Sequence, residues 1–179
     1  MSKVLANVVL GGYDESRFVP NDIVFPFGAD DSRPFTLGMQ SISGLNTLSG
    51  SVSMLTQGVI SLVDSTVPHS WLPREVCDQS EKAFGLTYNN LTDLYIINSA
   101  MRSRLLELNA TITFKLGTDK VGGSTFNIVL PYAAFDLQAK HPLYENATNY
   151  PIRRGANDTQ YVLDRTFLQE AYLVGGKHF

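Results

Sequence analysis

The sequence predicts a mainly β fold arranged as a single domain over residues 1–179. Of the 179 residues, 44% are hydrophobic and 17% are charged, which is typical of one globular domain with a substantial core. Most apolar segments are short and rich in β-branched or aromatic residues, and Gly, Asn, Asp or Pro separates them. Only one segment carries a strong helical signature. We therefore expect many short strands and one or two short helices.

Eight segments have the length and composition of strands. They are residues 4–10, 23–27, 35–42, 51–55, 59–63, 111–116, 125–130 and 160–163. The clearest turn signals are at 11–12, 28–31, 44–46 and 117–123. Two of these turns stand between runs of strand length, as hairpins require.

The strongest helix signal covers residues 73–84, because Pro73 stands near its first position and Gly85 ends it. A second, shorter helix is expected over 99–107, with Ser99 as its cap. The expected inner faces consist of Val76, Ala83 and Phe84 in the first helix and of Met101, Leu105, Leu106 and Leu108 in the second.

Charge and hydropathy restrict the possible partners. With 17 acidic and 14 basic residues the net charge is −3, so the sequence has no electrostatic signature for nucleic acid or an anionic membrane. No apolar run approaches the length of a membrane span, and the first residues lack the sections of a secretory signal. We expect no nucleic-acid partner and no membrane segment in this chain.

The single cysteine and the Asn-x-Ser/Thr sequons bear on whether the protein enters the secretory pathway. Cys77 has no second cysteine in the chain, so we expect a small buried residue on a helix, and pairing with a cysteine outside these residues stays open. Four Asn-x-Ser/Thr sequons occur where about two are expected by chance, which favours the secretory pathway. These candidate glycosylation sites are Asn90, Asn109, Asn146 and Asn157.

Most common catalytic and binding motifs are missing from the sequence. His69, His141 and His178 lack metal-ligand spacing, so we interpret them as surface or packing residues. The sequence contains no nucleophile elbow, Walker loop or dinucleotide fingerprint, and we expect no cofactor and no metal. Arg153 and Arg154 could bind an anion but are more typical of a solvated strand end.

One carboxylate requires an explanation. Asp64 ends the apolar run 59–63, where desolvation penalises a charge, and Ser65, Thr66 and Pro68 follow it. The simplest interpretation is a turn in which the Asp64 or Ser65 side chain accepts hydrogen bonds from nearby N–H groups. The alternative is a functional carboxylate.

The order of motifs along the chain favours the second interpretation. From about residue 8 to residue 174 the sequence resembles the C-terminal half of pepsin-like aspartic proteases, most closely the secreted or cell-surface members of filamentous fungi. The motifs that carry the resemblance are Leu-Gly-Gly-Tyr-Asp at 10–14, Val-Asp-Ser-Thr at 63–66, Leu-Pro before a helix at 72–73, Leu-Pro-Tyr-Ala-Ala-Phe at 130–135 and Val-Leu-Asp-Arg-Thr-Phe-Leu at 162–168.

The resemblance implies one lobe of the pepsin-like double-psi fold and an aspartic-type endopeptidase that cleaves a peptide or protein substrate. Asp64 would be the second-lobe catalytic aspartate, Ser65 and Thr66 would support its loop, and the protein would be extracellular or on the cell surface. In that family two carboxylates share a proton and activate water, a pairing for which pepsin is a standard example. Because the chain has no second Asp-Ser/Thr-Gly, we expect the first lobe to be absent and the isolated chain to be inactive.

A non-catalytic role is the alternative, in which the β domain binds a peptide or partner protein through the face left open by the missing lobe. A homodimer that brings two Asp64 side chains together is possible but not favoured, because Thr66 and Val67 would crowd the two-fold contact.

Three residues depart from the family pattern. Thr66 stands where the family has Gly, and Val67 stands where it has a hydroxyl, unless one residue is deleted and Thr66 supplies that hydroxyl. Asp164 replaces a glycine beneath the loop, where its charge should be costly unless it turns to solvent or finds a partner. The chain is expected to be incomplete at both ends.

Overall fold

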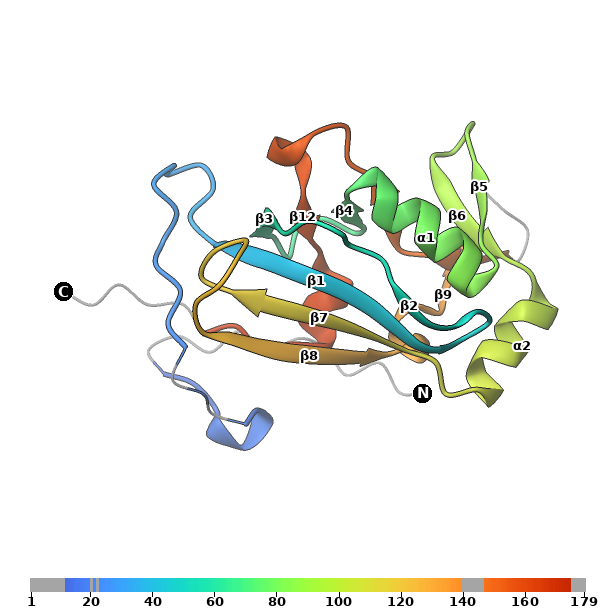
Figure 1. Cartoon of the computed structure of the whole chain (residues 1–179), viewed down its shortest axis with the longest axis horizontal. Coiled ribbons are helices and arrows are strands. Elements are labelled where there is room, and N and C mark those ends of the chain that lie inside the picture. The colour runs from blue at the N-terminus through green and yellow to red at the C-terminus, as the bar shows by residue number, and fades with distance from the viewer. Residues whose placement is uncertain (1–11, 20, 22, 140–146, 175–179) are drawn as a thin grey trace.

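The structure is a computed structural model that describes residues 12–19, 21, 23–139 and 147–174. Its larger sheet has eight strands in the order β11–β4–β12–β3–β1–β7–β8, with β2 paired to β1. Figure 1 shows the long strands β1, β7 and β8 running side by side. The strands are β1 (Thr36–Thr47), β2 (Gly50–Ser53), β3 (Val59–Val63), β4 (Ser70–Leu72), β7 (Thr111–Gly117), β8 (Thr125–Pro131), β11 (Ile152–Arg154) and β12 (Val162–Leu163).

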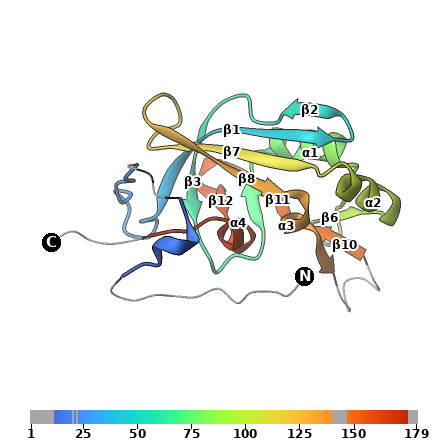
Figure 2. The ribbon, with the colours of Figure 1, turned by 90° about the horizontal axis from the view of Figure 1, so that it is seen from below.

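A second, four-stranded antiparallel sheet has the order β5–β6–β10–β9. Its strands are β5 (Thr87–Asn89), β6 (Leu94–Ile97), β9 (Leu137–Ala139) and β10 (Ala147–Tyr150). The helices are α1 (Arg74–Phe84), α2 (Ser99–Glu107), α3 (Tyr132–Phe135) and α4 (Arg165–Glu170), and two short 3-10 turns cover Glu15–Arg17 and Asp158–Gln160. Figure 2 shows α4 beside β12 and β3.

Helix α1 forms as its sequence predicts. It begins after Pro73 and ends at Gly85, whose φ of 63° is in the left-handed region and whose N–H donates to the Glu81 carbonyl. Its buried side includes Val76, Ala83 and Phe84, which confirms the predicted inner face.

The core between the sheets and α1 is rich in stacked aromatic rings. The ring of Phe135 lies 5.1 Å from that of Tyr150, and the ring of Phe84 lies 5.4 Å from that of Tyr150. Such pairs add to the stabilisation that comes from area burial alone. Because Tyr150 belongs to β10 and Phe84 to α1, this contact joins the smaller sheet to the helix.

Several sequence expectations were wrong. Residues 23–27 form no strand, and β1 continues through the expected turn at 44–46 with a register shift before it reaches Thr47. The cap of α2 is Asn98 rather than Ser99, because the Asn98 side chain accepts the Met101 N–H. Of the expected inner face of α2, only Leu105 is buried. The segment predicted at 4–10 and His141, Asn146 and His178 lie outside the described residues.

No helix within the described part of the chain is long and apolar enough to cross a membrane.

Candidate functional site

The candidate site is the loop of residues 64–69, which connects β3 to β4 (hereafter the Asp64 loop). Strand β12 lies between these two strands, parallel to β3 and antiparallel to β4. The Asp64 N–H donates to the Leu163 carbonyl at 3.0 Å, and the Arg165 N–H donates to the Val67 carbonyl at 3.2 Å. A strand from the end of the chain therefore supports a loop that lies about one hundred residues earlier.

Asp64 is half-buried at the start of this loop. Its Oδ1 accepts the Thr66 N–H at 2.8 Å and the Thr66 hydroxyl at 2.7 Å. These are the contacts of the turn interpretation, and they orient the carboxylate at the end of a buried strand. An oriented, partly accessible carboxylate can accept a proton or a hydrogen bond from a bound molecule.

The structure also shows which side chain supplies a hydroxyl to Asp64. Thr66 donates it, although Thr66 stands only two residues after Asp64. Thr66 and Ser65 are both exposed, while Val67 is half-buried and its carbonyl is bound to the segment that follows β12. Among the residues predicted to support the loop, Thr66 therefore contacts Asp64 directly.

Asp164 is buried beneath the loop and has found a partner there. It is 1% exposed, and its Oδ1 accepts the Ser70 hydroxyl at 2.8 Å and the Phe167 N–H at 3.1 Å. The contact with Phe167 makes Asp164 the N-cap of α4. Burial raises the pKa of Asp164, against the opposing effect of its hydrogen bonds with Phe167 and Ser70.

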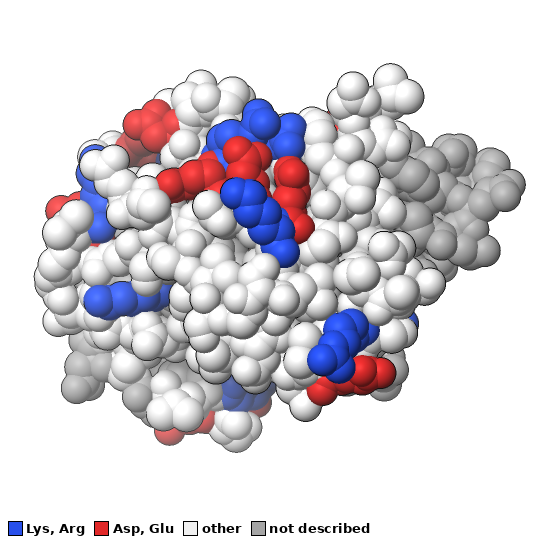
Figure 3. Space-filling model, turned by 45° about the vertical axis from the view of Figure 1, so that its right-hand side comes forward, with Lys and Arg blue, Asp and Glu red and all other residues white. Residues whose placement is uncertain are grey.

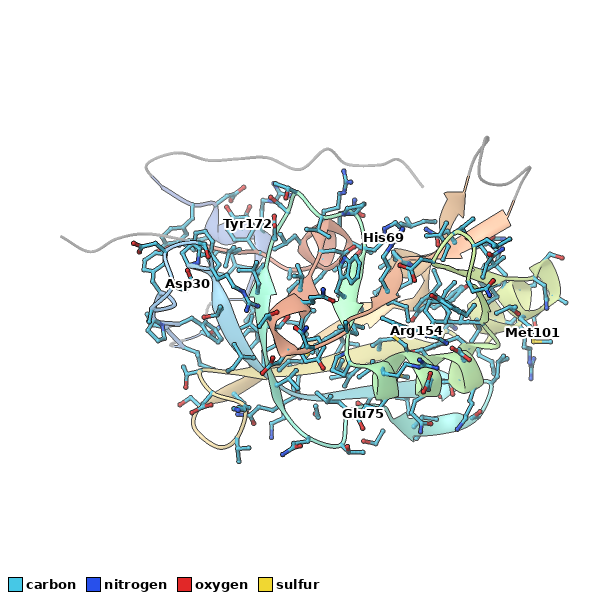
Figure 4. The ribbon with its side chains drawn as sticks, turned by 90° about the horizontal axis from the view of Figure 1, so that it is seen from above. Asp30, His69, Glu75, Met101, Arg154 and Tyr172 are labelled. Carbon is cyan, nitrogen blue, oxygen red and sulfur yellow. The ribbon has the colours of Figure 1, made fainter. Side chains whose placement is uncertain are left out.

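His69, labelled in Figure 4, occupies the last position of the loop, directly before β4. The Asn149 side-chain amide lies 3.1 Å from its Nε2, and we assign the amide Nδ2 as the donor to a neutral ring. Burial lowers the pKa of His69 to about 4, with a further contribution from the positive charges of Arg153 and Arg165. His69 is therefore a neutral packing residue near pH 7.

The prediction that Arg153 and Arg154 are solvated was wrong. The Arg154 Nε donates to the Tyr95 hydroxyl at 2.7 Å, its Nη2 donates to Glu81 Oε1 at 2.7 Å, and its guanidinium lies 3.7 Å from the ring centre of Tyr88. Figure 3 shows acidic and basic side chains gathered on one face of the molecule. These contacts bind β11 to α1 and to the β5–β6 hairpin.

Arg153 is held in a similar way. Its Nη1 donates to Asp93 Oδ2 at 2.8 Å, and its guanidinium lies 5.7 Å from the ring centre of Trp71. No sequence signal predicted these pairs, because Asp93 is 60 residues from Arg153 and Glu81 is 73 residues from Arg154.

The structure also describes Cys77 and three of the four sequon asparagines. Cys77 is buried on α1, as predicted, and burial raises the pKa of its thiol to about 12, so the reactive thiolate is disfavoured. Asn90, Asn109 and Asn157 are exposed. The Asn157 side chain accepts the Thr159 N–H and hydroxyl, at 3.1 and 2.6 Å.

Among the described residues, no group of three His, Cys, Asp or Glu side chains is arranged to hold a metal ion.

Comparisons with known proteins give a structural match. No protein-family model and no curated protein matches the sequence. Among solved structures, the aspartic proteinase from Irpex lacteus matches with a TM-score of 0.57 and 16% sequence identity, over 89% of this chain and 45% of that chain. The chain thus spans less than half of the length of this protein. An identity this low supports a statement about the fold alone, and the chain has the mainly β fold of one half of an aspartic proteinase.

Proposed function

We propose that this chain is the second lobe of an aspartic-type endopeptidase, with Asp64 as its catalytic carboxylate. The observation that supports the proposal is the position of Asp64 at the end of β3, in a loop supported by β12, within a fold that matches half of an aspartic proteinase. In the reaction, one carboxylate takes a proton from water while a second donates one toward the peptide carbonyl oxygen. Asp64 can fill one of these two roles.

The isolated chain should lack activity because the second role needs a carboxylate within hydrogen-bond distance of the same water. Apart from Asp64, whose own motif has Thr66 in place of the glycine, the sequence offers no Asp-Ser/Thr-Gly that could supply it. We expect the purified chain to leave a peptide substrate uncleaved at acidic pH. Cleavage that pepstatin inhibits and that Asp64→Ala abolishes would contradict the predicted inactivity of the isolated chain.

A chimera tests the catalytic role itself. This chain would replace the matching half of the Irpex lacteus aspartic proteinase, and cooperative thermal unfolding would establish that the chimera is folded. We expect pepstatin-sensitive peptide cleavage, its loss with Asp64→Ala, and its retention with the exposed control Thr159→Ala. A folded chimera that is inactive, or whose activity survives Asp64→Ala, would refute the role of Asp64.

A second candidate is a non-catalytic domain that binds a peptide or partner protein beside the Asp64 loop. It is favoured by two aromatic side chains, Phe27 and Phe35, which are 42% and 39% exposed with ring centres 5.5 Å apart. The Phe35 carbonyl accepts the Val63 N–H at 2.8 Å, so this apolar pair adjoins the end of β3. Exposed apolar groups of this kind often mark binding surfaces.

The oligomeric state of the chain distinguishes a surface that binds another protein from a surface through which two copies of this chain form a dimer. Sedimentation of the purified chain should give a monomer that Phe35→Ser does not change. A dimer that Phe35→Ser dissociates would instead indicate that two copies meet beside the Asp64 loop.

A further inference from the structure

The end of the Asp64 loop is closed by two buried side chains. The Ser70 hydroxyl donates to Asp164 Oδ1 at 2.8 Å and accepts the Asp164 N–H at 3.3 Å. Ser70 begins β4, and Asp164 follows the last residue of β12. At the other end of the loop, the Asp64 N–H donates to Leu163. Two consecutive residues, Leu163 and Asp164, therefore hold both ends of the loop.

The contacts of the Asp164 carboxyl group are uneven. Its Oδ1 receives two donors, from Ser70 and Phe167, whereas its buried Oδ2 has no hydrogen-bond partner within the described ranges. Thr166 also lies near the carboxyl group, and hydrogen bonding from its hydroxyl and its N–H lowers the pKa of Asp164, although Oδ2 itself has no partner in good hydrogen-bond geometry. A carboxylate in this position would place charge on a buried oxygen that has no hydrogen bond of good geometry, which is costly.

The arrangement fits a protonated acid better. Oδ1 then acts as the carbonyl oxygen that accepts two hydrogen bonds, and Oδ2 carries the proton and no charge. We propose that Asp164, as a neutral carboxylic acid, positions the Asp64 loop through Ser70, so that the closure of this loop depends on one proton. This proposal rests on the contacts of Asp164 and goes beyond the proposed peptidase function.

Other ionisable groups surround this clamp. Asp64 follows β3, His69 precedes β4, Arg165 follows Asp164 on α4, and Arg153 lies on β11, which pairs with β4. On α3, which packs against α4, Tyr132 is buried and its pKa is raised, so it does not titrate near neutrality. His69, with its pKa lowered to about 4, is the neighbour whose protonation must be separated from that of Asp164.

Trp71 provides a local probe. It is the single tryptophan of the chain, it follows Ser70, and it pairs with Val162 of β12. Its fluorescence in the folded chain would be recorded from about pH 3 to about pH 9, a range in which carboxyl groups with raised pKa values titrate. The variants are Asp164→Asn, which mimics the neutral acid, Ser70→Ala, which removes the clamp, and His69→Gln as the control.

The wild-type chain should show a one-proton fluorescence transition as the pH rises, and His69→Gln should keep it. Asp164→Asn should lose the transition. Ser70→Ala should move it to higher pH, because the carboxylate has lost a donor, and should reduce its amplitude at Trp71.

Urea unfolding gives a second readout with a defined sign. Because the folded-state pKa of Asp164 is raised, its contribution to stability is complete below the unfolded pKa of about 3.9 and is lost as the pH rises through the folded pKa. Within this window the unfolding constant of the wild type should rise by up to about tenfold per pH unit relative to that of Asp164→Asn.

An unchanged transition in Asp164→Asn, or equal pH dependence of the two unfolding constants, would overturn the proposal. If Asp164→Asn does not fold, Ser70→Ala alone decides, and an unshifted transition in Ser70→Ala refutes the clamp. None of these measurements uses proteolysis, so their result does not depend on that of the chimera.

Discussion

Replacing Arg154 with Met should destabilise the fold far more than an ordinary surface substitution does. The Arg154 side chain is only 20% exposed, and the change removes its bonds to Glu81 and Tyr95 and its contact with the Tyr88 ring. A hydrogen bond to a charged group contributes about 1.5 to 3 kcal/mol, and a partly desolvated cation–π contact about 1 kcal/mol. Since these contributions share one side chain and are partly screened by solvent, we expect a total of about 3 kcal/mol.

Arg74 provides the matched control. Arg74 lies on α1 and forms an ion pair with Asp78 of the same helix at 2.8 Å, but its side chain is 63% exposed. An exposed pair of this kind contributes about 0.5 kcal/mol or less. Arg74→Met should therefore be nearly neutral, which separates the loss of a positive charge from the loss of the buried contacts.

Urea unfolding near pH 7, followed by Trp71 fluorescence, measures both variants. For a slope of about 2 kcal/mol per molar urea, Arg154→Met should lower the midpoint by about 1.5 M, and Arg74→Met by about 0.25 M or less. If the two midpoints agree within error, the contacts of Arg154 contribute no more than an exposed ion pair, and the assigned role of Arg154 is wrong.

Two further predictions concern packing and pH. Gly38→Ala should destabilise the chain by about 2 kcal/mol, because a Cβ at Gly38 would overlap the Asp119 carbonyl oxygen. Gly12→Ala meets open space and should be neutral. Equal thermal midpoints of the two variants would contradict this packing. His69→Gln should lose less stability than the wild type between about pH 6.5 and about pH 4, because the unfolded chain protonates His69 before the folded chain does. Urea midpoints measured across that range would count against the buried neutral ring if both proteins declined equally.

The elements that the sequence predicted well carry their own local signals. Strand β3 has the predicted bounds because a mostly apolar run, Val-Ile-Ser-Leu-Val, ends at a charge, and Pro73 and Gly85 mark the two ends of α1. Strands β4 and β11 have only three residues each, and they form because they pair with each other although they are far apart in the sequence. Three residues are too few to show a periodic pattern.

In the candidate site, too, some features could be predicted from the sequence and others could not. Asp64 could be identified from the sequence because it places a charge at the end of an apolar run, whereas Asp164 was singled out because it stands where the resemblance implies a glycine. The partner of Asp164 could not be predicted, since Ser70 is 94 residues away and nothing around Ser70 indicates that it is buried. The contact between Thr66 and Asp64 was easier to anticipate, because it spans two residues and follows from turn chemistry.

The insertion of β12 between β3 and β4 has a consequence for the order of folding. Strands β3 and β4 are only six residues apart in sequence, yet β12, which lies between them, is the last strand within the described residues. During synthesis the Asp64 loop therefore lacks the support of β12 until about one hundred further residues have been added. Contacts this distant in sequence form slowly. The candidate site therefore assembles later than the hairpins β1–β2 and β7–β8, and a ribosome stalled before residue 162 would carry a chain whose Asp64 loop lacks the support of β12.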